Sequence, residues 1–302
     1  MKTTFFYLFL ALFLFSCQSN GDKNVISGKE KYEKGDLQGA ILEYSQAIKD
    51  NPDNVDAYYE RGLTKDDLGD YKGAIEDYTK AIELDPKLVE AYNNRGFAMN
   101  SLNEFESAIA DYNKAIEIDP LFATAFNNRG LAKNNLGDNK EAIADYTKAI
   151  EINPDYALAY YNRGSVKDEL NDIQGAIEDY NKSIKLDPKS ALTYNNRGFA
   201  KSELEDYKGA IEDYNIAIKL DPSSYQAYNN RGLAFDYLEA YQSAIEDYNK
   251  SLEIKPDYSI AFANRGYAKY LIEDIEGACA DWTKASELGI TDVNESLQKY
   301  CK

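Results

Sequence analysis

Histidine is absent from the sequence, and cysteine, methionine and tryptophan are rare, with three, two and one residues respectively. Histidine is the usual general base at neutral pH and the commonest metal ligand, so its absence disfavours most hydrolase mechanisms. Cysteines without histidine make a poor metal site, and no activated nucleophile is visible. We therefore expect a protein that is not an enzyme and that holds neither a metal nor another cofactor.

Basic residues are also scarce relative to acidic ones. The chain has 34 Lys and Arg against 52 Asp and Glu, a formal net charge of −18. A chain of this charge repels nucleic acid and anionic lipid headgroups. We expect no nucleic-acid partner, and a protein or peptide partner that is basic or neutral.

Proline occurs only seven times, and each proline follows the previous one by 34 residues. The prolines are Pro52, Pro86, Pro120, Pro154, Pro188, Pro222 and Pro256. A constant period of this size is typical of a repeat array, in which each unit packs mainly on its neighbours. The sequence therefore favours one elongated solenoid over two compact domains.

One repeat, Tyr194 to Pro222, shows the layout of the unit. Small and aromatic residues follow at fixed offsets, and the second half has the apolar spacing of one helical face. This layout resembles the tetratricopeptide repeat, although Arg197 and Lys201 stand where that family usually has Leu and Tyr. The resemblance implies an all-α fold, a right-handed α-solenoid of eight helix-turn-helix repeats over residues 25–292, followed by a capping helix over 293–302.

Glycine recurs at two places in the repeat. Gly or Asn occupies the link between the two helices in five repeats, where a left-handed conformation ends the first helix. The last three links carry Glu instead, so the sequence specifies those turns less well. These link residues are Gly35, Gly69, Asn103, Gly137, Asn171, Glu205, Glu239 and Glu273. A second column, which includes Gly198, lies inside the first helix at a cost of roughly 1 kcal/mol each. We expect the backbone of a neighbouring helix to approach this second column closely.

An arginine column and an aspartate column recur together. The arginines are Arg61, Arg95, Arg129, Arg163, Arg197, Arg231 and Arg265. An acidic residue stands 16 positions after each of them, as Asp213 does after Arg197. We predict that each Arg pairs with an Asp of this column. The first repeat lacks the Arg and is expected to leave Glu43 alone. In the other interpretation, the arginines line a groove as anion contacts.

An asparagine precedes the arginine in six repeats: Asn94, Asn128, Asn162, Asn196, Asn230 and Asn264. The family resemblance implies that this column faces a concave groove. An amide offers both a donor and an acceptor, so the column is a candidate binding site for the backbone of an extended peptide. The alternative is that these asparagines bond neighbouring helices and only assist stacking.

Residues 1–16 resemble a bacterial lipoprotein signal peptide. An apolar run from Phe5 to Phe15 precedes Ser16 and Cys17, and it is about half the roughly 20 residues that a spanning helix needs. The resemblance implies lipidation of Cys17, a flexible tether over 17–24 and attachment to the bacterial cell envelope, with Gln18 favouring the outer membrane. Ordinary secretion and an uncleaved anchor are the alternatives.

The other two cysteines, Cys279 and Cys301, lie near the C-terminus. In an oxidising envelope they could form a disulfide that fastens the capping helix to the last repeat, with a stabilisation of about 3 kcal/mol for a loop of this length. The alternative is one buried thiol and one exposed thiol.

These observations predict a non-catalytic scaffold that is anchored by lipid and binds an extended protein or peptide segment in its groove. Two other functions remain open. The chain could be a structural subunit that assembles through its convex face or its ends, or a lipoprotein that binds glycans through exposed aromatic residues. The fold cannot name the pathway, because repeat proteins serve many processes on one architecture.

Overall fold

The computed structural model describes residues 20–301, and all regular secondary structure in this range is helical. The signal-peptide segment and Cys17 lie outside the described residues. The described chain divides into two units between Asn153 and Pro154. Among the described helices, none has the length and apolar composition needed to cross a bilayer.

The first unit contains four helix pairs. Its helices are α1 (Asn20–Glu33), α2 (Leu37–Asp50), α3 (Val55–Asp67), α4 (Tyr71–Leu84), α5 (Val89–Ser101), α6 (Phe105–Ile118), α7 (Ala123–Asn135) and α8 (Asn139–Ile152). Because α1 begins at Asn20, residues 20–24 are helical, and the expected tether over 17–24 is wrong for this part. Asp22 lies in the first turn, where a negative charge favours the helix dipole, and Val25 is buried.

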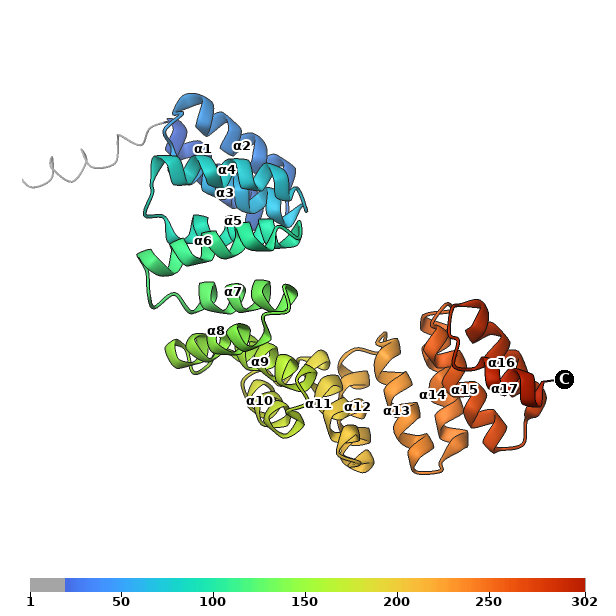
Figure 1. The fold of residues 1–302 in the computed structure, drawn as a ribbon. Coiled ribbons are helices and arrows are strands. Elements are labelled where there is room, and N and C mark those ends of the chain that lie inside the picture. Colours follow the sequence, from blue (N-terminus) through green and yellow to red (C-terminus); the bar gives the residue numbers. More distant parts are fainter. Residues whose placement is uncertain (1–19, 302) are drawn as a thin grey trace, which may run out of the picture. The chain divides into compact units, whose positions relative to one another are not determined.

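The second unit contains four further pairs and a short last helix. Its helices are α9 (Ala157–Glu169), α10 (Ile173–Leu186), α11 (Ala191–Glu203), α12 (Tyr207–Leu220), α13 (Tyr225–Tyr237), α14 (Tyr241–Ile254), α15 (Ser259–Leu271), α16 (Ile275–Glu287) and α17 (Asn294–Tyr300). Within each unit the pairs follow one another as a stack (Figure 1). This all-α solenoid arrangement is the fold class that the repeat predicts.

Within each unit, the first helix of each pair after the first contacts both helices of the pair before it. In the second unit, α11 packs on α12 within its pair, α12 packs on α13 of the next pair, and α11 also touches α13. The first helices of successive pairs therefore lie beside one another. We call the surface that α9, α11, α13 and α15 share the first-helix face of the second unit.

A buried aromatic ring fills the centre of each pair. The rings are Tyr44, Tyr78, Tyr112, Tyr146, Tyr180, Tyr214, Tyr248 and Trp282, each at most 1 % exposed. A Cβ atom at Gly198 would lie 2.8 Å from Cε1 of Tyr214, and the other repeats show the same contact. The expectation that helix backbone approaches the glycine column is thus wrong. The ring of the partner helix takes that space.

The Gly and Asn links between paired helices have the predicted left-handed conformation, and the three Glu links adopt it as well. Gly69 has φ 76°, and Glu205, Glu239 and Glu273 have φ of 62°, 59° and 67°. A left-handed residue with a Cβ costs roughly 1–2 kcal/mol. In five repeats the Asp that follows the link caps the second helix, as when Asp206 accepts a hydrogen bond from the N–H of Gly209. Asp138 follows Gly137 but accepts no such bond.

Candidate functional site

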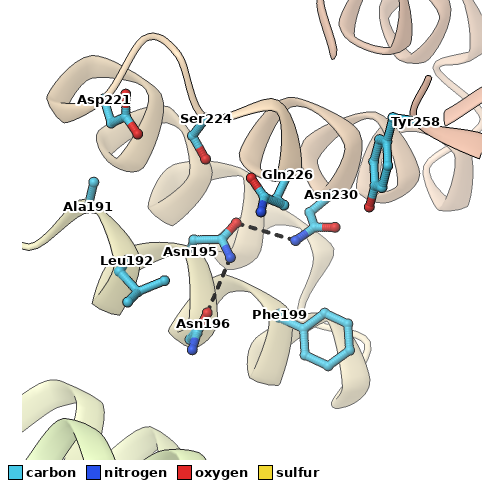
Figure 2. A pocket seen from close by; sticks show the side chains of 10 residues that line it. All are labelled: Ala191, Leu192, Asn195, Asn196, Phe199, Asp221, Ser224, Gln226, Asn230 and Tyr258. Carbon is cyan, nitrogen blue, oxygen red and sulfur yellow. Dashed lines mark hydrogen bonds between the residues drawn. The ribbon is translucent and has the colours of Figure 1, made fainter. Parts of the chain in front are cut away.

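The first-helix face of the second unit contains a cavity of about 490 Å³. Its lining residues are Ala191, Leu192, Asn195, Asn196 and Phe199 from α11, Asp221 and Ser224 from the next turn, Gln226 and Asn230 from α13, and Tyr258 before α15. We call this cavity the amide pocket, because four of its lining residues carry side-chain amides (Figure 2).

The amides of this pocket form a chain of hydrogen bonds between two repeats. Asn230 Nδ2 donates to Asn195 Oδ1 at 3.3 Å, and Asn195 Nδ2 donates to Asn196 Oδ1 at 3.2 Å (Figure 2). Asn196 Nδ2 in turn donates to Tyr161 Oη at 3.1 Å. These bonds fix the orientation of each amide. An asparagine amide has two N–H donors and an oxygen with two lone pairs, so each keeps capacity for a further partner.

Apolar side chains flank this polar chain. Leu192 is 56 % exposed and Phe199 is 44 % exposed, and both line the pocket. The site therefore combines oriented donors and acceptors with exposed apolar surface. This combination suits a chain segment that offers its own backbone amides together with apolar side chains.

The predicted asparagines occupy equivalent positions, but the structure brings only two of them into this pocket. Asn196 and Asn230 line it, and Asn264 lines a smaller cavity between α13 and α15. In the first unit, Asn94 donates to Tyr59 and Asn128 donates to Asn93. Asn162 lies in α9 and also takes part in a contact. The stacking role is thus present in the structure, and the ligand-binding role stays a prediction.

Several residues of the pocket were not singled out by the sequence. Asn195 precedes Asn196 directly, and the repeated Asn-Asn pair was a signal that could have identified it. Asp221 and Ser224 lie in the turn before α13, and Tyr258 directly precedes α15. Only the fold shows that these turns reach the pocket.

The predicted arginine–aspartate pairs are confirmed in all seven repeats that carry the arginine. They are Arg61–Asp77, Arg95–Asp111, Arg129–Asp145, Arg163–Asp179, Arg197–Asp213, Arg231–Asp247 and Arg265–Asp281. Arg197 binds Asp213 through Nε at 2.8 Å and Nη2 at 2.5 Å, and Lys201 Nζ adds a contact at 2.8 Å. Each pair therefore joins the two helices of one repeat with charge-assisted bonds.

The first repeat differs from the expectation. Glu43 is not alone, because Lys31 Nζ lies 2.6 Å from its Oε1. Lys31 is four residues after the missing arginine position, and Lys201 has the same place in its own repeat. In the repeat with Phe235 at that place, Asp247 forms its ion pair with Arg231, and burial raises the pKa of Asp247.

A different aspartate column carries carboxylates with altered acidity. Burial raises the pKa of Asp66, Asp168 and Asp236 to about 6 in each case. Nearby acidic groups contribute further at Asp66 and Asp168, and the Tyr248 hydroxyl opposes the shift at Asp236. Each of the three has a buried Oδ1 without a hydrogen-bond partner. These side chains are partly buried, and a carboxylate oxygen taken out of water is normally hydrogen-bonded or paired with a cation.

The C-terminal cysteines are joined in the structure. Cys279 of α16 and Cys301 after α17 form a disulfide with Cα atoms 5.5 Å apart. Val293, Leu297 and Tyr300 pack on Trp282 at the same end of the unit. In the described part of the chain, no group of three or more acidic or cysteine side chains is arranged to hold a metal ion.

Models of two repeat families match the repeats of this chain. A family model described as TPR repeat matches residues 28–65, 67–102, 98–137, 134–167 and 202–236, and a model described as tetratricopeptide repeat matches 157–190 and 225–258. These matches span more than half of the chain. The chain is a tetratricopeptide-repeat protein. Folds of this family serve protein interaction, and the stacked helix pairs agree with the assignment.

Solved structures of other tetratricopeptide-repeat proteins are similar to this one. YrrB, described as a TPR protein with an unusual peptide-binding site, is 27 % identical with a TM-score of 0.53, over 62 % of this chain and 96 % of YrrB. MamA is 31 % identical with a TM-score of 0.50, over 58 % of this chain and 98 % of MamA.

A tetratricopeptide-repeat protein from Parabacteroides merdae ATCC 43184 is 22 % identical with a TM-score of 0.60, over 82 % of this chain and 98 % of that one. At this identity the likeness concerns the fold alone. A search of curated protein sequences gives no significant match.

Proposed function

We propose that this tetratricopeptide-repeat protein is a non-catalytic scaffold that binds an extended protein segment on the first-helix face of its second unit. The amide pocket carries this proposal. Three asparagines, Asn195, Asn196 and Asn230, are oriented by bonds to one another and still have hydrogen-bonding capacity. YrrB, which has a peptide-binding site, supports the same class of ligand.

The ligand's backbone and side chains would be bound by different groups. An extended segment has free N–H and C=O groups, which amides bind without selecting a particular side chain. The exposed Leu192 and Phe199 would contact its apolar side chains. The net charge of −18 favours a basic or neutral segment, because complementary charge speeds association and disfavours acidic competitors.

We also propose that the scaffold is attached to the bacterial envelope through lipid on Cys17. Its net charge of −18 disfavours nucleic acid as a partner. The sequence around Cys17 supports this attachment. Replacement of Cys17 by Ser should abolish labelling of the protein by an alkyne-tagged fatty acid in growing bacteria. Equal labelling of the wild-type and variant proteins would contradict the lipid anchor.

Binding of selected peptides tests the scaffold function. Peptides are selected from a random library against the full-length protein, and their affinities are then measured for Asn196→Ala, Asn230→Ala and Asn128→Ala variants. We expect the first two variants to bind about tenfold more weakly, since each hydrogen bond contributes roughly 1 kcal/mol and the neighbouring amides lose their orientation.

Asn128 is the matched control, because it makes the same inter-repeat bond to Asn93 but does not line the amide pocket. The melting temperatures of all three variants show whether the lost ladder bond affects folding. If Asn196→Ala and Asn230→Ala bind the peptides as well as Asn128→Ala does, the amide pocket is not the binding site.

A further inference from the structure

A second cavity, of about 320 Å³, lies between α13 and α15 in the same unit. Its lining residues are Leu233, Asp236 and Tyr237 from α13, and Asn264, Tyr267 and Leu271 from α15. We call it the tyrosine pocket. Its wall combines two tyrosine rings with one carboxylate, and no other residue in the lining carries a formal charge.

The carboxylate of Asp236 has no cationic partner among the described ion pairs. Its Oδ2 accepts a hydrogen bond from Tyr248 Oη at 2.6 Å, and its Oδ1 is buried without a partner. The aspartates of the other column differ, since Asp213 has both Arg197 and Lys201. Asp236 therefore contributes a negative charge that the protein itself does not neutralise.

Contacts with other aromatic rings orient both tyrosines of the pocket. The ring of Tyr237 stacks on Tyr207 of the preceding repeat, with centroids 4.6 Å apart and an interplanar angle of 11°. The ring of Tyr267 meets Trp282 edge-on at 5.2 Å. Tyr237 nevertheless stays 59 % exposed and Tyr267 41 % exposed. These contacts orient the rings without covering them.

The pocket's chemistry selects a cation with an apolar stem. Aromatic faces attract cations through their quadrupole, and the attraction increases when water is excluded. A carboxylate within a few ångströms adds a Coulombic attraction that is stronger near protein than in bulk water. Leu233 and Leu271 offer apolar surface for an aliphatic chain, as lysine and arginine side chains have.

We propose that the tyrosine pocket binds the cationic side chain of a lysine or arginine carried by the extended segment. The proposal rests on the proposed function and adds a side-chain preference to it. The tyrosine pocket and the amide pocket both involve α13 and the α15 repeat, so one segment along this face would meet the two in succession. The backbone would be held at the amides and one basic side chain at the tyrosines.

The chain offers a matched control within the same column. Asp66 has the same position in its own repeat, a pKa raised in the same way and a buried Oδ1 without a partner. Asp67 stands where the other repeat has Tyr237, so the aromatic wall is missing there. Asp66→Asn therefore removes an equivalent carboxylate without touching the tyrosine pocket.

Fluorescence of the single tryptophan provides the assay, because Trp282 contacts Tyr267. The full-length protein is titrated with a blocked Ala-Lys-Ala peptide, with the same peptide carrying norleucine instead of lysine, and with tetramethylammonium. We expect saturable binding of the lysine peptide at pH 7 and at least about tenfold weaker binding of the norleucine peptide, from loss of the cation–π and charge interactions.

The variants then locate the binding. Asp236→Asn and Tyr237→Leu should each lower the affinity for the lysine peptide about tenfold. Asp66→Asn should leave this affinity unchanged. Tyr237 is largely exposed, so Tyr237→Leu keeps the test informative if Asp236→Asn folds poorly. Equal binding of the norleucine peptide, or no effect of both variants, would overturn the proposal.

Tighter binding of tetramethylammonium than of the lysine peptide would overturn the assignment to a side chain. The result is separable from the proposed function. If the library peptides bind the Asn196→Ala and Asn230→Ala variants more weakly, but the lysine and norleucine peptides bind equally well, the tyrosine pocket alone is refuted. If the asparagine variants bind the library peptides as well as the wild-type protein does, but the lysine peptide still binds more tightly than the norleucine peptide, the amide pocket alone is refuted.

Discussion

Replacement of Arg197 by Leu tests the charged pairs that join the two helices of each repeat. Asp213 is only 2 % exposed, and Arg197 supplies two of its contacts. Removing one partner of a buried pair costs about 3–5 kcal/mol. Lys201 remains 2.8 Å from Asp213, so we expect the lower end of this range. Leu would leave Asn181 Oδ1 without the N–H that Arg197 Nη1 donates.

Two measurements are needed, because repeat proteins unfold locally as well as globally. At roughly 2 °C per kcal/mol for a chain of this size, a loss of 3 kcal/mol lowers the melting temperature by about 6 °C. In the Arg197→Leu variant, amide hydrogen exchange in α11 and α12 should be faster than in the wild-type protein, while exchange in α9 should change less. The double variant Arg197→Leu with Asp213→Leu should recover much of the loss, since an apolar pair leaves no unpaired charge.

Lys250→Ala is the control, because Lys250 and Glu253 form an ion pair that is 42 % and 70 % exposed. An exposed pair contributes under about 1 kcal/mol. If Arg197→Leu shifts the melting temperature and the exchange of α11 no more than Lys250→Ala does, the buried pair does not hold the helices together.

Three further predictions concern the turns, the carboxylates and the C-terminus. Glu239 has φ 59°, so Glu239→Gly should raise the free energy of unfolding by about 1 kcal/mol, measured by thermal melting; an unchanged or lower melting temperature would contradict the strain. Burial raises the pKa of Asp168 to about 6, so the folded state binds more protons than the unfolded state between about pH 4 and 6, and stability increases as the pH falls through this window. Asp168→Asn should therefore raise the melting temperature at pH 7 and make little difference near pH 4, and a gain that is independent of pH would refute the titration. Cys301→Ser should destabilise the C-terminal repeat by about 3 kcal/mol and speed hydrogen exchange in α17, whereas exchange equal to that of the wild-type protein would show that the disulfide does not hold this helix.

The constant period made much of the fold predictable. A column that recurs every 34 residues has one environment in each repeat, so Arg197 and Asp213 could be paired from their joint recurrence. The left-handed conformation could also be predicted for links such as Gly69 and Asn103, whereas the sequence specified the Glu205 link less well, and this link adopts the same conformation. In these cases the same contact recurs in several repeats, so several residues indicate it.

Contacts between particular side chains were harder to predict. The glycine column indicated a close approach but not its partner, since a tyrosine ring and a helix backbone both need a residue without Cβ. The pairing of Glu43 with Lys31 occurs in the one repeat that departs from the pattern. The walls of the tyrosine pocket come from different repeats, and Tyr237 and Tyr207 belong to columns that hold other residues elsewhere.

Photo-crosslinking at Phe199 tests the central claim most directly. A benzophenone amino acid at Phe199 lies beside the amide pocket, and the same group at Ile216, which is 37 % exposed on α12, serves as the control. Mass spectrometry of the products identifies the crosslinked segment. Our account predicts that Phe199 captures one contiguous segment of a partner and that Asn196→Ala reduces its yield. Capture at Ile216 with none at Phe199 would contradict it and would favour assembly through another surface.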